Sequence, residues 1–181
     1  MNATALLEKY FPGKDAFQII LEHSRLVAAK ALLTARNLAP PGVDLIFLEE
    51  AALLHDIGVC RTAAPKFHCY GTEPYIRHGV IGREILDWEG FPRHALVCER
   101  HIGVGLTVAD IRSQELPLPE EEMIPLSLEE KIVCFADLFY SKSPLNCGRE
   151  KNIDEIKTGL ERFSKQKVMI FEGWLKEFKL V

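Results

Sequence analysis

Hydrophobic residues recur along this chain with the three- and four-residue spacing of α-helices almost throughout. Residues 17–35 form one apolar stripe that includes a histidine, made of Ile20, His23, Val27 and Ala31. Residues 45–56 form a second stripe, made of Leu48, Ala51, Ala52 and His55. No segment shows the alternation of apolar and polar residues, bounded by hairpin turns, that predicts strands. The pattern therefore predicts an all-α fold.

Residues that start and stop helices divide the first two thirds of this pattern. Gly58 suits the end of the second helix, because glycine readily adopts the left-handed conformation of a helix end. Thr72-Glu73-Pro74 predicts a helix start with proline in the first turn, and the helix would run to about Trp88. Pro92 opens the next predicted helix, residues 92–101.

Two further helices are predicted by capping patterns. Ser127-Leu128-Glu129-Glu130 is a capping box ahead of an apolar run, residues 128–141. Asn152-Ile153-Asp154-Glu155 repeats the pattern before a long amphipathic stripe. We therefore expect a C-terminal packing helix over residues 153–178.

The chain length favours a single domain, residues 1–181, long enough to bury a real core. We expect a helical bundle of about six to eight helices, with no sheet larger than two short strands. Two segments, 59–73 and 103–126, carry prolines and glycines and are expected to be irregular. Loops on a rigid helical frame are where substrate contacts usually lie.

Composition narrows the class of protein. The chain is 48% hydrophobic and 27% charged, as is ordinary for a globular protein. The net charge of −4 provides no positive field for nucleic acid, so no nucleic-acid partner is expected. No apolar run is long enough to span a bilayer, and the start shows no signal peptide. The five cysteines are odd in number and lack CxxC spacing, which favours free thiols in a cytoplasmic protein.

The chemistry of the chain centres on His55-Asp56-Ile57-Gly58. Four further positions join its histidine and aspartate in an ordered set of nitrogen and oxygen donors: His23, His55, Asp56, His78, His101 and Asp137. Any one of them has a structural explanation, such as a satisfied core histidine. A purely structural explanation is hardest for Asp137, because this residue lies in an apolar run where a carboxylate needs a strong partner. All of them in this order predict a metal site, and six ligands suit two adjacent metals better than one.

These motifs resemble those of the HD-domain superfamily of metal-dependent phosphohydrolases, in the variant that reads HDIG. The resemblance covers residues 20–141. It begins at His23-Ser24, passes through the HDIG motif, continues with His78-Gly79 and Glu99-Arg100-His101, and ends at Phe135-Ala136-Asp137. The resemblance implies an all-α HD-domain bundle in which the ligands converge from several helices on one or two divalent metals.

Members of this superfamily with histidines at the positions of His78 and His101 tend to be binuclear. The resemblance then implies that Asp56 bridges two metals and takes part in catalysis, that His23, His55 and Asp137 complete one metal's shell, and that His78 and His101 serve the other. Imidazole and carboxylate ligands favour iron or manganese, with cobalt, nickel, magnesium or zinc as alternatives. A metal-bridging hydroxide would then hydrolyse a phosphate ester.

The substrate is expected to be a small phosphorylated molecule, for which a nucleotide is one candidate. The spacing is similar to that of bacterial diadenosine-tetraphosphate hydrolases, but the long segment 102–126 departs from them, so that substrate is not carried over. Arg61, Lys66 and Lys142 follow ligand helices into loops and are candidate phosphate contacts. His68 is either a further substrate contact or a solvent-exposed residue. His94 lies two helical turns before His101 and is the rival for its ligand role.

Two other functions remain alternatives from the sequence. A few members of the superfamily use the same six ligands in a mixed-valent di-iron oxygenase. A non-catalytic metal-binding signalling module is the other alternative, although the full ligand set argues against a degenerate site. A homodimer is compatible with the sequence, which does not determine the oligomeric state.

Overall fold

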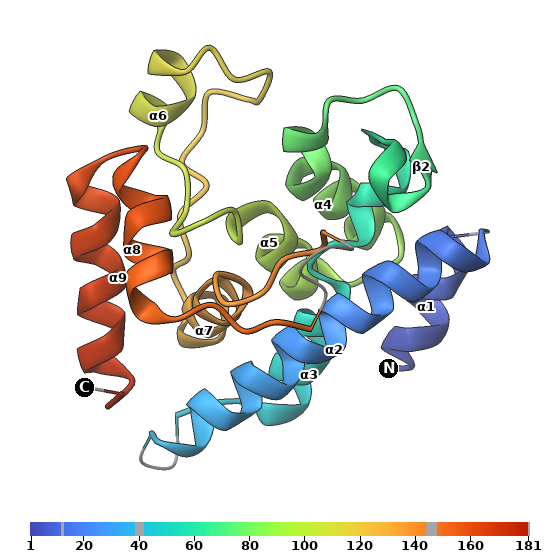
Figure 1. Cartoon of the computed structure of the whole chain (residues 1–181). Helices are drawn as coiled ribbons and strands as arrows, with labels where there is room; N and C mark the ends of the chain where they lie inside the picture. Colours follow the sequence, from blue (N-terminus) through green and yellow to red (C-terminus); the bar gives the residue numbers. More distant parts are fainter. Residues whose placement is uncertain (12, 39–41, 144–147, 181) are drawn as a thin grey trace.

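The computed structural model describes residues 1–11, 13–38, 42–143 and 148–180. Within them the fold is all-α, as predicted, and its nine α-helices are accompanied by a single two-stranded sheet (Figure 1). The α-helices are α1 (Ala3–Tyr10), α2 (Lys14–Arg36), α3 (Leu45–Leu54), α4 (His78–Trp88), α5 (Pro92–Arg100), α6 (Val108–Ser113), α7 (Leu128–Asp137), α8 (Ile153–Glu161) and α9 (Lys165–Glu177). Among the described helices, none has the length and apolar character needed to cross a membrane.

The segment between α3 and α4 is built from short elements. It contains three 3-10 helices and two strands: η1 (Ile57–Arg61), β1 (Ala63–Ala64), η2 (Pro65–Phe67), β2 (Cys69–Tyr70) and η3 (Tyr75–Arg77). The strands pair antiparallel, with Ala63 opposite Tyr70 and Ala64 opposite Cys69. This small hairpin is within the expected limit of two short strands.

The long helix α2 runs diagonally through the lower part of the view in Figure 1. It packs on α3 and α7 and contributes residues to both large cores. One core joins α2, α3 and α7 to the C-terminal helices, where the Phe135 ring stacks at 5.5 Å on that of Phe171. The other core joins α1 and α2 to η1, α4 and α5. Large apolar side chains buried in both cores hold the ends of these helices together.

The structure corrects the expected helix 153–178, which is two helices, α8 and α9. The chain turns at Ser164, whose backbone is extended and whose side chain accepts a hydrogen bond from the backbone N–H of Lys167. A serine cap starts a new helix, and the apolar stripe continues on α9 because both helices face the same core. Helices α1 and α6 are not among the expected ones, so the described part of the chain holds nine α-helices where six to eight are predicted.

Two predicted helix boundaries also move. The helix expected from Thr72 begins its α-helical part only at His78, after the 3-10 helix η3. The helix expected to end at Gly58 ends at Leu54, and Gly58 lies buried in η1. A side chain at Gly58 would overlap with the backbone carbonyl of His78 and the backbone nitrogen of Gly82. Glycine is therefore needed here for close packing on α4, not for ending a helix.

The segment 103–126 carries helix α6 and is held to the rest of the molecule by a buried lysine. Lys167 of α9 donates to the backbone carbonyl of Gly105 and to Asp110 Oδ2, both at 2.6 Å. Asp110 also forms the capping box of α6 with Thr107. This ion pair fixes the segment beside α9.

Candidate metal centre

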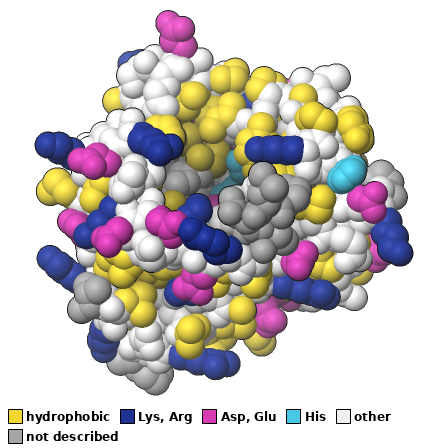
Figure 2. All heavy atoms as spheres, in the orientation of Figure 1, with side chains coloured by type: hydrophobic (Ala, Val, Ile, Leu, Met, Phe, Trp, Pro, Cys, Tyr) yellow, Lys and Arg dark blue, Asp and Glu magenta, His cyan; other side chains and the backbone are white. Residues whose placement is uncertain are grey.

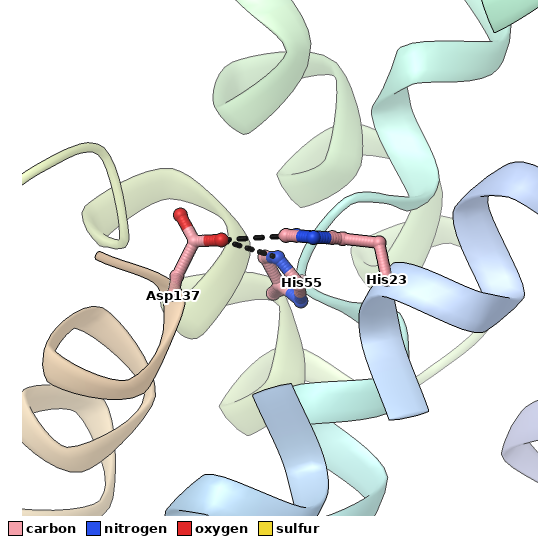
Figure 3. A group of neighbouring side chains, drawn as sticks. All are labelled: His23, His55 and Asp137. Atoms are coloured by element: carbon pink, nitrogen blue, oxygen red, sulfur yellow. Dashed lines mark ion pairs between the residues drawn. The ribbon is translucent and has the colours of Figure 1, made fainter. Parts of the chain in front are cut away.

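The first group of candidate ligands comes from three helices. His23 lies in the middle of α2, His55 directly follows α3, and Asp137 ends α7. Figure 3 shows both imidazoles pointing toward the same carboxylate oxygen of Asp137. The Nε2 atoms of His23 and His55 lie 2.9 and 3.5 Å from Asp137 Oδ1. The same two Nε2 atoms lie 3.4 and 3.2 Å from Asp56 Oδ2, so four donor atoms converge.

The second group lies on the other side of Asp56. The Oδ1 atom of Asp56 is 3.5 Å from His78 Nε2 and 3.6 Å from His101 Nε2. The two Nε2 atoms are 3.1 Å apart. Asp56 thus directs one oxygen toward each group, which is the arrangement a bridging carboxylate needs. The structure brings all six predicted ligands together, and their assignment as metal ligands stays a prediction.

Backbone hydrogen bonds determine which ring nitrogen faces the cluster in three of the four histidines. The Nδ1 atoms of His55, His78 and His101 each lie 2.7 Å from the backbone carbonyl three residues earlier. A carbonyl only accepts hydrogen bonds, so Nδ1 carries the proton in the neutral form of each ring, and Nε2 is then the nitrogen whose lone pair faces the cluster. Fixing the tautomer through an outer hydrogen bond is how proteins orient histidine ligands.

Close backbone packing positions Asp56 against the second group. Gly58 packs directly on the start of α4, which carries His78. Gly79 and Gly82 of α4 in turn pack on α5: side chains there would lie 2.8 Å from the carbonyl of Cys98 and 2.9 Å from its Cβ atom. Small residues at these three positions let η1, α4 and α5 approach closely enough for Asp56, His78 and His101 to meet.

The protonation equilibria favour a cation at the cluster. Burial lowers the pKa of His23 to about 4, helped by the Lys142 ammonium, and burial lowers the pKa of His78 to about 3, helped by His101. Both rings are therefore neutral at pH 7. Burial also opposes charge on His55, but the carboxylates of Asp56 and Asp137 outweigh it and raise its pKa to about 10. A bound metal would displace that proton, because a coordinating imidazole must be neutral.

The donor set fits a divalent metal. Asp56 is fully buried, and within the described residues neither of its carboxylate oxygens forms a hydrogen bond of ordinary geometry, although the Lys142 ammonium lies 2.8 Å from Oδ2. The Nε2 atoms of His23 and His55 also form none there. Buried polar atoms without partners are costly. At His78 and His101, two lone pairs face each other at 3.1 Å and require a positive charge between them. Imidazole nitrogens with carboxylate oxygens suit first-row transition metals. Two overlapping sets of ligand atoms have the spacing of a metal site, one from His23, His55 and Asp137 and the other from His55, Asp56 and His101.

Lys142 is the one predicted substrate contact that reaches the cluster. Its Nζ atom lies 2.8 Å from Asp56 Oδ2 and 4.0 Å from Asp137 Oδ1, and the side chain is largely buried. Beside it lies Tyr75, which the sequence analysis did not single out. The Tyr75 ring stacks on His78 with a centroid distance of 4.8 Å, and burial raises the pKa of its hydroxyl to about 12 although the nearby Lys142 ammonium opposes the rise.

The other residues considered from the sequence lie elsewhere. Arg61 is exposed and faces Glu84 at 4.0 Å. The Lys66 ammonium lies over the rings of Phe67 and Tyr75, 4.7 and 5.8 Å from their centroids. Since Tyr75 stacks on His78, Lys66 contacts a neighbour of the cluster. The exposed His68 lines a cleft of about 550 Å³ with residues such as Tyr10 and Cys69.

His94, the rival of His101, faces away from the cluster. Its Nε2 atom lies 3.3 Å from Glu50 Oε2, and the ring packs edge-on against Phe47 and Phe91. His101 is the histidine of this helix region that meets Asp56. The geometry thus favours His101 as the ligand.

Comparison with known proteins agrees with this site. A family model, the HD domain, matches residues 20–141. An uncharacterized protein of Methanocaldococcus jannaschii is 40% identical over 121 residues, 65% of this chain and 64% of the relative. Two tRNA (cytidine(56)-2'-O)-methyltransferases, from Picrophilus torridus and Thermoplasma volcanium, are 32% and 31% identical over 72% and 75% of this chain. The chain spans only 37% and 35% of those two enzymes. No solved structure matches it.

Proposed function

Since the chain belongs to the HD domain family, we propose that it is a metal-dependent phosphohydrolase acting on a small phosphate ester or anhydride. The observation that supports this most directly is the buried Asp56, whose two oxygens face separate groups of histidine and carboxylate donors. Two divalent metals held there would activate a water and neutralise charge on a phosphate. Iron and manganese fit the donors best, with cobalt, nickel, magnesium and zinc as alternatives.

The protein's own residues would balance the charge of the metals and bind the phosphate. Asp56 and Asp137 supply two negative charges to offset the metals, and the four histidines remain neutral. Lys142 adds a positive charge next to Asp56, where it can donate hydrogen bonds to a phosphate oxygen. The excess positive charge suits a dianionic phosphate.

The surroundings of the site favour an organic phosphate such as a nucleotide. Figure 2 shows a hollow with hydrophobic side chains around it and a histidine side chain visible inside. Ile76 lies two residues before His78 and Ile102 directly follows His101, and both are partly exposed. An apolar wall beside a charged centre would hold the organic part of an ester while its phosphate meets the metals. We do not infer methyltransferase activity for this chain, because the match covers little more than a third of those two enzymes.

The test is phosphate release under anaerobic conditions. The protein is stripped with a chelator, reloaded with reduced manganese, iron, cobalt or nickel, and screened against nucleotides and other phosphate esters. We expect turnover that chelation abolishes, that His101→Ala lowers by two orders of magnitude or more, roughly the loss typical of a disabled catalytic metal site, and that His94→Ala leaves largely intact.

Two results would contradict the proposal. Turnover only with oxygen, consumed in proportion to product, would assign the chain to the oxygenase alternative. Full metal loading without release of phosphate from any ester would favour the signalling module.

A further inference from the structure

Lys142 shares an oxygen atom with the candidate ligands. Its ammonium lies 2.8 Å from Asp56 Oδ2, the atom that also faces His23 and His55. A divalent cation bound to the same oxygen would be within a few ångströms of the ammonium, inside a buried site where like charges repel strongly. A metal at this position therefore requires Lys142 to change its partner.

Tyr75 offers that second partner. Its hydroxyl is near enough to the Lys142 ammonium for that charge to oppose the rise in pKa that burial causes, and a phenolic oxygen can accept a hydrogen bond while donating its own. The tyrosine is held firmly on the His78 side: its ring stacks on the imidazole with 26° between the planes, and its backbone carbonyl accepts from His78 Nδ1 at 2.7 Å. The hydroxyl is thus a fixed acceptor beside the cluster.

We propose that Lys142 is an internal counter-ion, which exchanges Asp56 for the Tyr75 hydroxyl and a substrate phosphate oxygen when a divalent metal binds. Tyr75 is then a positioning residue that keeps the displaced ammonium at the site. Metal binding would in this way free Lys142 to contact phosphate, so the metal precedes the substrate. The inference rests on the proposed metal site, and it is tested without turnover.

The experiment is a double-mutant cycle on Mn²⁺ affinity, measured by calorimetry with the full chain at pH 7. Lys142→Met removes the competing ammonium and should tighten Mn²⁺ binding about tenfold, within the usual range for groups in contact. Tyr75→Phe keeps the ring and the backbone carbonyl but deprives the displaced ammonium of its acceptor. It should weaken binding roughly threefold. In the Lys142→Met background, Tyr75→Phe should have no effect.

The control is Tyr70→Phe, an exposed tyrosine of β2, which should leave Mn²⁺ affinity unchanged. Unchanged or weaker binding by a folded Lys142→Met variant would overturn the inference. So would an equal effect of Tyr75→Phe in both backgrounds, which would show that Tyr75 acts through His78 alone. If Lys142→Met does not fold, Tyr75→Phe decides, since unchanged affinity contradicts the exchange. Failure of phosphate release with these affinities as expected would count against the proposed function only.

Discussion

Asp56 is the residue on which both groups of donors depend. Its Oδ2 atom faces His23 and His55, and its Oδ1 atom faces His78 and His101. For each of the four histidines this is the Asp56 oxygen to which the contact is recorded. Removal of the aspartate should therefore affect both groups, whereas removal of one histidine should affect one.

This geometry predicts different metal contents for two variants. Asp56→Ala should bind neither metal, because both groups lose a carboxylate oxygen. His78→Ala should lose mainly the metal on the His101 side. Metal per chain is measured by inductively coupled plasma mass spectrometry after reloading, with His94→Ala as the buried control on α5. Full occupancy by both metals in His78→Ala would disprove the binuclear assignment.

The residues of the site differ in how far the sequence could predict them. The six ligands follow from their chemical type and order, because buried carboxylates and histidines in apolar runs need partners. Arg61, Lys66 and Lys142 are candidates because they follow ligand helices into loops, and proximity along the chain does not determine where a side chain points. Only Lys142 of these three contacts the cluster. Tyr75 gave no signal, because an aromatic residue before a histidine is ordinary in any sequence.

At the scale of elements, the sequence predicted helices where local signals and apolar spacing agree. Helices α2, α3, α5 and α7 begin within a few residues of their expected starts. Helix α6 was not predicted, because the Thr107–Asp110 capping box lies in a segment dominated by glycine and proline. The turn at Ser164 was not predicted either, since the apolar stripe runs through it and only the tertiary fold shows that two helices share one core.

The ion pair that fixes the segment 103–126 predicts a pH dependence. Burial raises the pKa of Asp110, but the hydrogen bonds from Lys167 and Thr107 outweigh it, and the net pKa lies below the ordinary value of 3.8. A lowered carboxyl pKa means that the stabilisation is present above about pH 4 and is lost as the pH falls through the folded-state value. Asp110→Asn should therefore destabilise the protein at pH 7 by about 2 kcal/mol, as for a partly buried pair that loses one member.

Urea unfolding at pH 7 and at pH 3 measures this difference, which should shrink at the lower pH. Glu120→Gln is the matched control in the same segment, because its partner Arg112 is exposed and such pairs contribute little. An Asp110→Asn penalty that is equal at both pH values would show that the carboxylate charge has no part in holding the segment.

At the scale of the whole molecule, the site joins parts of the chain that are distant in sequence. The six candidate ligands come from α2, from the ends of α3, α5 and α7, and from the start of α4. The helices α8 and α9 supply no ligand, but Phe171 and Trp174 of α9 pack in the same core as Phe135 of α7. A metal bound only by the folded arrangement would therefore stabilise all of these elements together.

Thermal unfolding tests this coupling. At a free metal concentration about 100 times its Kd, one site adds about 2.7 kcal/mol to the free energy of unfolding. For a domain of this size the midpoint should rise by roughly 5–10 °C. Far-ultraviolet circular dichroism follows all helices, and in a Trp88→Phe background the fluorescence of the buried Trp174 follows α9. Because α9 shares its core with the ligand-bearing helix α7, both signals should give one midpoint and the same shift, and Asp56→Ala should abolish the shift. Separate transitions, with only the circular dichroism responding to metal, would show that α8 and α9 unfold independently of the metal centre.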